Sequence, residues 1–294
     1  MRPAFKWLAI AAAAIIGIMG VLIAYVAATF NPNAYKAQII DAVREKTGRT
    51  LQLQGDLSLS LFPSIGAKLA EASLSEPNST RIFASVTSAN ISVQVIPLVW
   101  KEVVVDAVEA QGLRANIERN RAGRMNFDDL TGADKKPDDK PATTVKVAIS
   151  RIDISKADLT YTDHAAGARY HLTGLDFRTG RVAAGVTTPL DVSATVSSEK
   201  DRARIETRLK GKLTFDLERQ FYKLDGLDFS AKGAYAEVSD LNATAKGDVE
   251  ARLATNEYLA DALNVSIGGK HAGGELKLKL DAPRLTLTRE TVAG

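Results

Sequence analysis

The chain has 294 residues, of which 45% are hydrophobic and 25% charged, a composition typical of a folded protein rather than a disordered one. Its 38 basic and 35 acidic residues leave a formal net charge of +3 and contain no basic block, which argues against nucleic acid as a partner. The chain has no cysteine, which excludes disulfides, thiolate nucleophiles and cysteine metal sites.

An uncharged apolar segment occupies residues 7–30, WLAIAAAAIIGIMGVLIAYVAATF. As a helix it would be about 36 Å long, which is enough to cross a bilayer. Trp7 and Tyr25 lie near its ends, where aromatic membrane anchors are typical. We therefore predict a cytoplasmic stub and transmembrane anchor over residues 1–30. Cleavage as a secretory signal peptide is the alternative, but the apolar core of such a peptide is usually only about 7 to 15 residues long.

Basic residues on both sides of this segment bear on its orientation. Arg2 and Lys6 precede it and favour a cytoplasmic N-terminus, which places the rest of the chain across the membrane. Lys36 and Arg44 follow it and act against this orientation, although long domains cross membranes despite such charges. We therefore expect a single-pass protein whose bulk lies outside the cytoplasm.

A short amphipathic helix is predicted over residues 31–48. The segment opens with Asn-Pro, an N-cap followed by proline at the first helical position. Tyr35, Ile39 and Val43 then recur every four residues until Gly48 ends the pattern. The apolar stripe of this helix either rests on lipid or closes the end of the structure that follows, and closure is the simpler reading.

After residue 48 the apolar residues alternate with polar ones over most of the chain. In RTLQLQGDLSLSLFP, residues 49–63, leucine occupies positions 51, 53, 57, 59 and 61. A period of two with one apolar face is typical of antiparallel strands. Turn residues, among them Gly226 and Gly273-Gly274, are expected to separate the strands. Further alternating runs occur at 91–95, 145–149, 205–217 and 276–280.

The segment 131–144, TGADKKPDDKPATT, is charged, contains proline and has almost no apolar side chains. Such a segment cannot order itself by burial. We therefore predict that it links two β-lobes, residues 49–130 and residues 145–294.

Signs of catalysis are missing from the sequence. His164, His171 and His271 do not have the spacing of metal ligands. No nucleophile elbow, Walker loop, dinucleotide fingerprint or zinc-protease motif is present. The sequence therefore predicts no catalytic residue, no metal site and no cofactor, and it gives no support for an enzyme.

Several short motifs occur together in the stretches 43–66 and 93–130. They are Thr47-Gly48-Arg49 opening a strand, Phe62-Pro63 ending it, Ile96-Pro97-Leu98 at a bend, and a close formed by Gly123, Asn126, Phe127, Asp128 and Leu130. With these motifs the chain resembles the AsmA family of bacterial envelope proteins, and the similarity continues into residues 155–180. Phe127 stands where many members carry tryptophan, and many members are much longer.

The resemblance implies a mainly β fold: an N-terminal transmembrane helix and a short amphipathic helix, followed by an elongated antiparallel β-sheet that forms an open, taco-like groove. It also implies an inner-membrane anchor, a periplasmic body, and phospholipid movement between inner and outer membrane that supports outer-membrane assembly, with envelope proteins as further partners. A structural scaffold for envelope assembly, without lipid transport, is the alternative function.

An apolar groove would suit lipid transfer because exposing acyl chains to water costs about 0.8 kcal/mol per methylene, or roughly 20 kcal/mol for a phospholipid with two chains of about 16 carbons. About 16 strands would give a groove roughly 75 Å long. The residues expected to line it are Leu51, Leu53, Leu57, Leu59, Leu61, Ile91, Val93, Val95, Val147, Ile149, Leu209, Leu213, Phe215, Leu276, Leu278 and Leu280.

Other β architectures would produce the same alternating runs. The apolar faces of a sandwich or a closed barrel pack against one another and leave no room for a ligand. An outer-membrane barrel is less well supported because the strands lack aromatic girdles. The deciding observation is whether the apolar face is open or covered.

Overall fold

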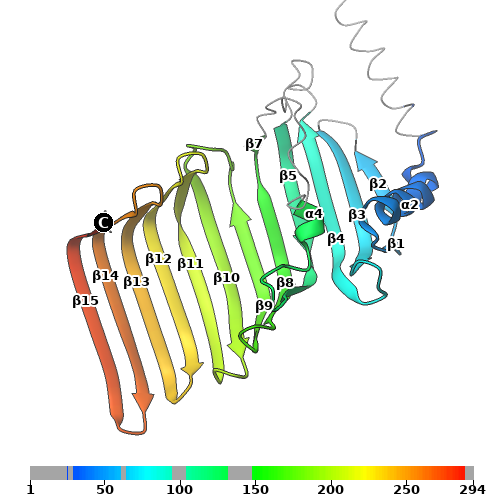
Figure 1. Ribbon diagram of the computed structural model, residues 1–294. Coiled ribbons are helices and arrows are strands. Elements are labelled where there is room, and N and C mark those ends of the chain that lie inside the picture. The colour runs from blue at the N-terminus through cyan, green and yellow to red at the C-terminus, as the bar shows by residue number, and fades with distance from the viewer. Residues whose placement is uncertain (1–24, 26–28, 61–63, 95–103, 132–147, 289–294) are drawn as a thin grey trace, which may run out of the picture.

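The computed structural model describes residues 25, 29–60, 64–94, 104–131 and 148–288. These residues form one long sheet with short helices near its N-terminal end (Figure 1), which confirms the prediction of a mainly β fold. The elements are η1 (Pro32–Tyr35), α2 (Lys36–Thr47), β1 (Leu51–Leu53), β2 (Leu57–Ser60), β3 (Ser64–Ser75), β4 (Ile82–Gln94), β5 (Val104–Gln111), β6 (Arg114–Arg119), α4 (Asp128–Thr131), β7 (Ala148–Ile149), β8 (Ile152–Asp163), β9 (Ala168–Thr179), β10 (Thr188–Ser198), β11 (Ala203–Asp216), β12 (Phe221–Tyr235), β13 (Val238–Arg252), β14 (Glu257–His271) and β15 (Gly274–Thr288).

The predicted helix over residues 31–48 is confirmed as η1 followed by α2. The Asn31 side chain caps its start by accepting a hydrogen bond from the Asn33 N–H. Gly48 ends α2 in the left-handed region at φ 66°, and its N–H donates to the Arg44 carbonyl oxygen at 2.9 Å. Proline at the start and glycine just past the end follow the usual asymmetry of helix termini.

The predicted transmembrane anchor, including Trp7, falls outside the described residues apart from its C-terminal end. Within the described part of the chain, no helix is both long and apolar enough to cross a membrane.

The fifteen strands of the described residues occupy twelve positions across the sheet, in the order β1-β3-β4-β5-β8-β9-β10-β11-β12-β13-β14-β15. The other three strands, β2, β6 and β7, each share a position with a strand of this order. Strand β2 follows β1 along β3, β6 follows β5 between β4 and β8, and β7 precedes β8 beside β5. Twelve positions at about 4.8 Å per step span about 53 Å. The sheet is therefore shorter than the 75 Å expected from 16 separate strands.

Neighbouring strands are antiparallel except at one place. There β5 pairs in parallel with β7 and β8, and β6 pairs in parallel with β8. The prediction of an antiparallel sheet is confirmed apart from this place. Parallel strands need a long crossover connection. The chain between Arg119 and Ala148 supplies that connection, and it contains the charged segment 131–144. The pairing of β6 with β8 joins the two predicted lobes within one sheet; their division into lobes stays a prediction.

Gly226 lies inside β12 rather than in the predicted turn. Its φ of 61° marks a bulge, and the pairing of β12 with both neighbours shifts register there. The Gly226 N–H donates to an Asp248 carboxylate oxygen of the adjacent strand at 2.6 Å. In the same way the Gly174 N–H in β9 donates to Asp158 at 3.0 Å. Bulges change the side-chain alternation, so a face can stay apolar although its residues do not alternate strictly.

Candidate functional site

One row of apolar side chains crosses the whole sheet on a single face. Residues paired across neighbouring strands lie on the same face, and the registers link one residue from each of the twelve strand positions. We call this set the apolar row. Its members, in order across the sheet, are Leu57, Leu69, Ala89, Ala110, Ile154, Phe177, Val192, Leu209, Phe229, Ala245, Val265 and Leu280.

Further apolar pairs flank the row on the same face, which we call the apolar face. Leu213 pairs with Leu224, and Ile267 pairs with Leu278. A bulge at Gly226 brings Leu224 and Phe229, five residues apart, onto this one face. The apolar face therefore extends along the strands as well as across them.

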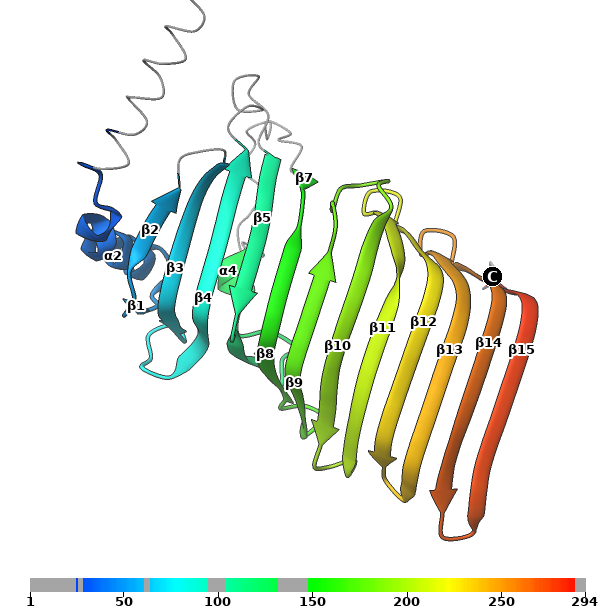
Figure 2. The ribbon, with the colours of Figure 1, turned by 180° about the vertical axis from the view of Figure 1, so that it is seen from behind.

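Within the described part of the chain, no second layer covers the large side chains of the apolar face. Every member of the apolar row is half-buried or exposed, and Leu280 is 44% exposed. Among the described residues, the hydrophobic side chains that are buried all belong to alanine: Ala72, Ala107, Ala157, Ala168, Ala194, Ala231 and Ala260. Sheets normally bury an apolar face against another element. The ribbon views from both sides show one layer (Figure 2), so the sandwich alternative does not apply to the described residues.

A hollow of about 310 Å³ lies on the apolar face between β11 and β15. Leu213, Leu224 and Val249 contribute aliphatic side chains to it, and Tyr222 and Tyr258 contribute aromatic rings. Its volume is at the lower end of the range for small-ligand sites. Apolar contacts have no preferred direction, so such a surface can hold a hydrocarbon chain without fixing its position.

The opposite face carries a matching row of polar side chains, which we call the polar row. Ion pairs run along it: Arg178 lies 3.5 Å from Asp153, and Lys210 lies 3.1 Å from Asp191. Such exposed pairs contribute little stability, but they keep this face in water. Its members are Ser58, Lys68, Asn90, Glu109, Asp153, Arg178, Asp191, Lys210, Asp228, Lys246, Asn264 and Asp281.

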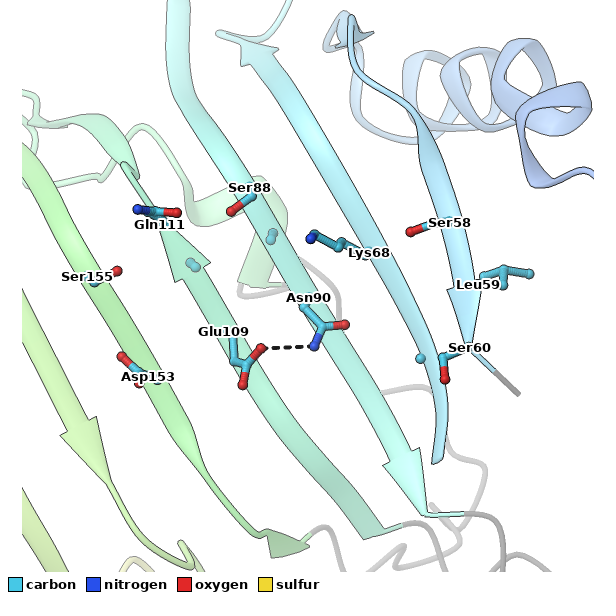
Figure 3. A pocket seen from close by; sticks show the side chains of 13 residues that line it. Ser58, Leu59, Ser60, Lys68, Ser88, Asn90, Glu109, Gln111, Asp153 and Ser155 are labelled. Carbon is cyan, nitrogen blue, oxygen red and sulfur yellow. Dashed lines mark hydrogen bonds between the residues drawn. The ribbon is translucent and has the colours of Figure 1, made fainter. Parts of the chain in front are cut away.

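The first five members of the polar row line a hollow of about 450 Å³ between β2 and β8 (Figure 3). Serine hydroxyls, including those of Ser88 and Ser155, surround it, and the Asn90 amide donates to Glu109 at 3.0 Å. Glu109 also pairs with Arg151. Leu59, Ala89 and Ala110 also border the hollow. Its charged and hydrogen-bonding side chains still distinguish it from the mostly apolar hollow between β11 and β15.

A buried arginine joins the two sequence motifs at the N-terminal end of the sheet. Arg49 is fully buried, and its guanidinium donates to both carboxylate oxygens of Asp129, at 2.8 and 2.7 Å. It also donates to the carbonyl oxygens of Ser75 at 3.0 Å and Asn126 at 2.5 Å, and it lies 4.8 Å above the Phe83 ring. The hydrogen bonds from Arg49 lower the pKa of the Asp129 carboxyl below its usual value.

The structure places the predicted lining residues as follows. Leu57, Leu209 and Leu280 belong to the apolar row. Leu61, Val95 and Val147 lie outside the described residues, and Tyr25, at 65% exposure, is the only described part of the predicted anchor pair. The other predicted lining residues belong to the apolar face by their pairing: Leu51, Leu53, Leu59, Ile91, Val93, Ile149, Leu213, Phe215, Leu276 and Leu278.

Several members of the apolar row were not foreseen. Phe177, Val192 and Phe229 lie in strands whose alternation is interrupted by bulges or by small residues, so a strict period of two does not single them out. The burial of Arg49 was also missed, because a charged residue beside a predicted membrane segment is normally solvated. Its only signal was its place in the Thr-Gly-Arg motif.

The fold and the two rows define an open, single-layer β-protein with one apolar and one polar face. The model of the AsmA family matches residues 1–288, so the chain belongs to the AsmA family. Comparisons with curated proteins and with solved structures gave no match.

Proposed function

We propose that this protein binds phospholipid acyl chains on its apolar face and conducts them between the inner and outer membranes, in support of outer-membrane assembly. The observation that carries the proposal is the apolar row. It crosses all twelve strand positions without a polar member, and no other described segment forms a layer over it. A contiguous exposed apolar surface marks a binding site for an apolar partner.

A hydrocarbon chain suits this surface better than a rigid ligand. Each methylene that leaves water for the apolar face gains about 0.8 kcal/mol, and the gain is similar at every strand position because aliphatic side chains recur there. A lipid tail can therefore move from strand to strand without crossing a region where it is exposed to water. The lipid headgroup would stay in solvent beside the sheet.

The proposed location follows from family membership and from the apolar segment 7–30. We propose a single-pass anchor in the bacterial inner membrane, with the N-terminus in the cytoplasm and the sheet in the periplasm. The phospholipids of the inner membrane are then the first partner, and envelope proteins are further partners.

A photoreactive residue in the apolar row tests the binding directly. Benzoylphenylalanine in place of Phe229 points onto the apolar face, and the same residue in place of Asp228 points onto the polar face. After illumination of the full-length protein in phospholipid vesicles, mass spectrometry should find lipid adducts at position 229 at least about tenfold more often than at position 228. Equal labelling at the two positions in a folded protein would reject the proposal.

The same experiment separates transport from the structural alternative. An envelope scaffold would bury its apolar face against another protein, so position 229 would form adducts with protein in whole cells and none with lipid. Lipid adducts in cells would favour the conduit.

A further inference from the structure

The helix α2 is fixed in one orientation at the N-terminal end of the sheet (Figures 1 and 2). In η1, directly before α2, the Asn33 side chain accepts from the Leu57 N–H at 2.9 Å and donates to the Leu57 carbonyl oxygen at 3.1 Å. At the end of α2, the Gly48 carbonyl oxygen accepts from the Asn78 N–H at 2.8 Å. Because η1 is bonded to β2 and the residue after α2 is bonded to the turn after β3, the outward side of the helix is fixed as well.

No residue of α2 is buried. The half-buried side, which turns toward the sheet, carries Ile40 and Val43 together with Lys36 and Thr47. The helix therefore uses only part of its apolar surface on the sheet. Of the predicted stripe Tyr35, Ile39 and Val43, only Val43 is half-buried, whereas Tyr35 and Ile39 are exposed. Closure of the sheet end by the whole stripe stays a prediction.

An aromatic and aliphatic stripe remains on the outward side. Phe30 is 43% exposed, Tyr35 46% and Ile39 40%, and the rings of Phe30 and Tyr35 are stacked with their centroids 5.5 Å apart. Ala42 and Lys46 continue the stripe at helical spacing and are exposed. We define Phe30, Tyr35, Ile39, Ala42 and Lys46 as the outer stripe.

We propose that the outer stripe lies on the surface of a phospholipid bilayer. Phe30 is the last residue of the apolar segment 7–30, so a membrane that holds this segment is the nearest apolar phase to the stripe. Tyrosine, phenylalanine and a terminal lysine are the residue types that occupy the membrane interface. Arg44 and Lys46 in the last turn form no ion pair within the described ranges, and free cations at a helix end attract anionic headgroups.

The consequence is a fixed angle between sheet and membrane. Since η1 is bonded to β2 and the residue after α2 to the turn after β3, the contact of the outer stripe with lipid would hold the N-terminal end of the apolar face beside the bilayer. This inference rests on the proposed membrane anchoring and adds the surface that orients the sheet.

The absence of cysteine allows a test with single labels on the full-length chain. Ile39→Cys places an environment-sensitive fluorophore on the outer stripe, and Asp41→Cys places it about 200° around the helix. The two proteins are reconstituted into vesicles of phosphatidylcholine and phosphatidylglycerol that contain a lipid with a spin label near its headgroup. We expect the spin label to quench the fluorophore at position 39 at least about threefold more strongly than the one at position 41.

Each other outcome overturns the proposal. If the protein floats with the vesicles but position 39 is no better quenched than position 41, the outer stripe does not touch lipid, and membrane anchoring still stands. A fluorophore at position 39 that is shielded from water yet unquenched by the lipid would show that protein covers the stripe. Failure of the unlabelled chain to float with vesicles would reject the anchoring and, with it, the bilayer contact.

Discussion

Arg49 and Asp129 form a bidentate ion pair between the start of the sheet and the helix α4, across 80 positions of sequence. The arginine is fully buried, whereas the aspartate side chain is 32% exposed. The pair brings together the Thr-Gly-Arg motif and the closing motif of residues 123–130, so these two motifs of the family have a shared structural role here.

Arg49→Gln should destabilise the protein by about 3 kcal/mol, because a buried ion pair that loses one partner leaves polar groups without hydrogen bonds. Urea unfolding followed by circular dichroism measures the change. Arg114→Gln is the matched control, since Arg114 lies 3.9 Å from Asp158 and is 76% exposed; it should cost less than about 1 kcal/mol. Equal losses for the two variants would contradict the assigned role of Arg49.

The same ion pair predicts a dependence of stability on pH. The hydrogen bonds from Arg49 hold the pKa of the Asp129 carboxyl below its usual value. A carboxyl group whose pKa is lowered by folding adds stability above the unfolded pKa, and this stability is lost as the pH falls through about 4 toward the folded pKa. Urea midpoints measured from pH 7 to pH 3 should therefore fall more steeply for the natural protein than for Asp129→Asn. Parallel curves would show that Asp129 does not contribute.

Gly226→Ala tests the bulge in β12. At φ 61° an added Cβ meets no atom within 4 Å. The variant should therefore lose about 1 kcal/mol of folding free energy through backbone strain alone. The control is Gly268→Ala in β14, where φ is negative or extended and the nearest atom lies 3.8 Å from the added Cβ. We expect Gly226→Ala to unfold at lower urea concentration than Gly268→Ala; the reverse order would rule out strain at the bulge.

Leu209→Asp should slow lipid transfer between vesicles by at least about tenfold, because an acyl chain that passes an uncompensated carboxylate must desolvate it. Leu209 lies in the middle of the apolar row, between Val192 and Phe229. Arg204→Asp in the same strand lies on the opposite face and should leave transfer unchanged. Transfer is followed with a fluorescent phospholipid, and both variants are first checked for unchanged circular dichroism. If Leu209→Asp left the transfer rate unchanged, lipid would not move along the apolar row.

Local patterns predicted much of this fold. The helix over residues 31–48 follows from its Asn-Pro start and its glycine end, and the strands at residues 51–60 and 276–280 follow from leucine alternation. The pairing of the strands was harder to predict from the sequence. Parallel pairing of β6 with β8 depends on a crossover that contains the charged segment 131–144, and the sequence of this segment predicts neither a helix nor a strand.

The apolar face was only partly predictable for a related reason. Phe229 and Leu224 are five residues apart, so strict alternation assigns them to opposite faces. Only the bulge at Gly226, with its N–H bonded to Asp248 of the next strand, brings both to the same face. The burial of Arg49 likewise depends on a partner 80 residues away, which no local pattern reveals.

From β8 to β15 each strand pairs with the strand that follows it in the chain. Most contacts in this part are therefore between immediate neighbours, as in repeat proteins. The gain or loss of one hairpin would alter the reach of the sheet by about 10 Å and leave the pairing of the preceding strands intact. Duplication or deletion of a short gene segment could thus lengthen or shorten such a sheet without a new fold.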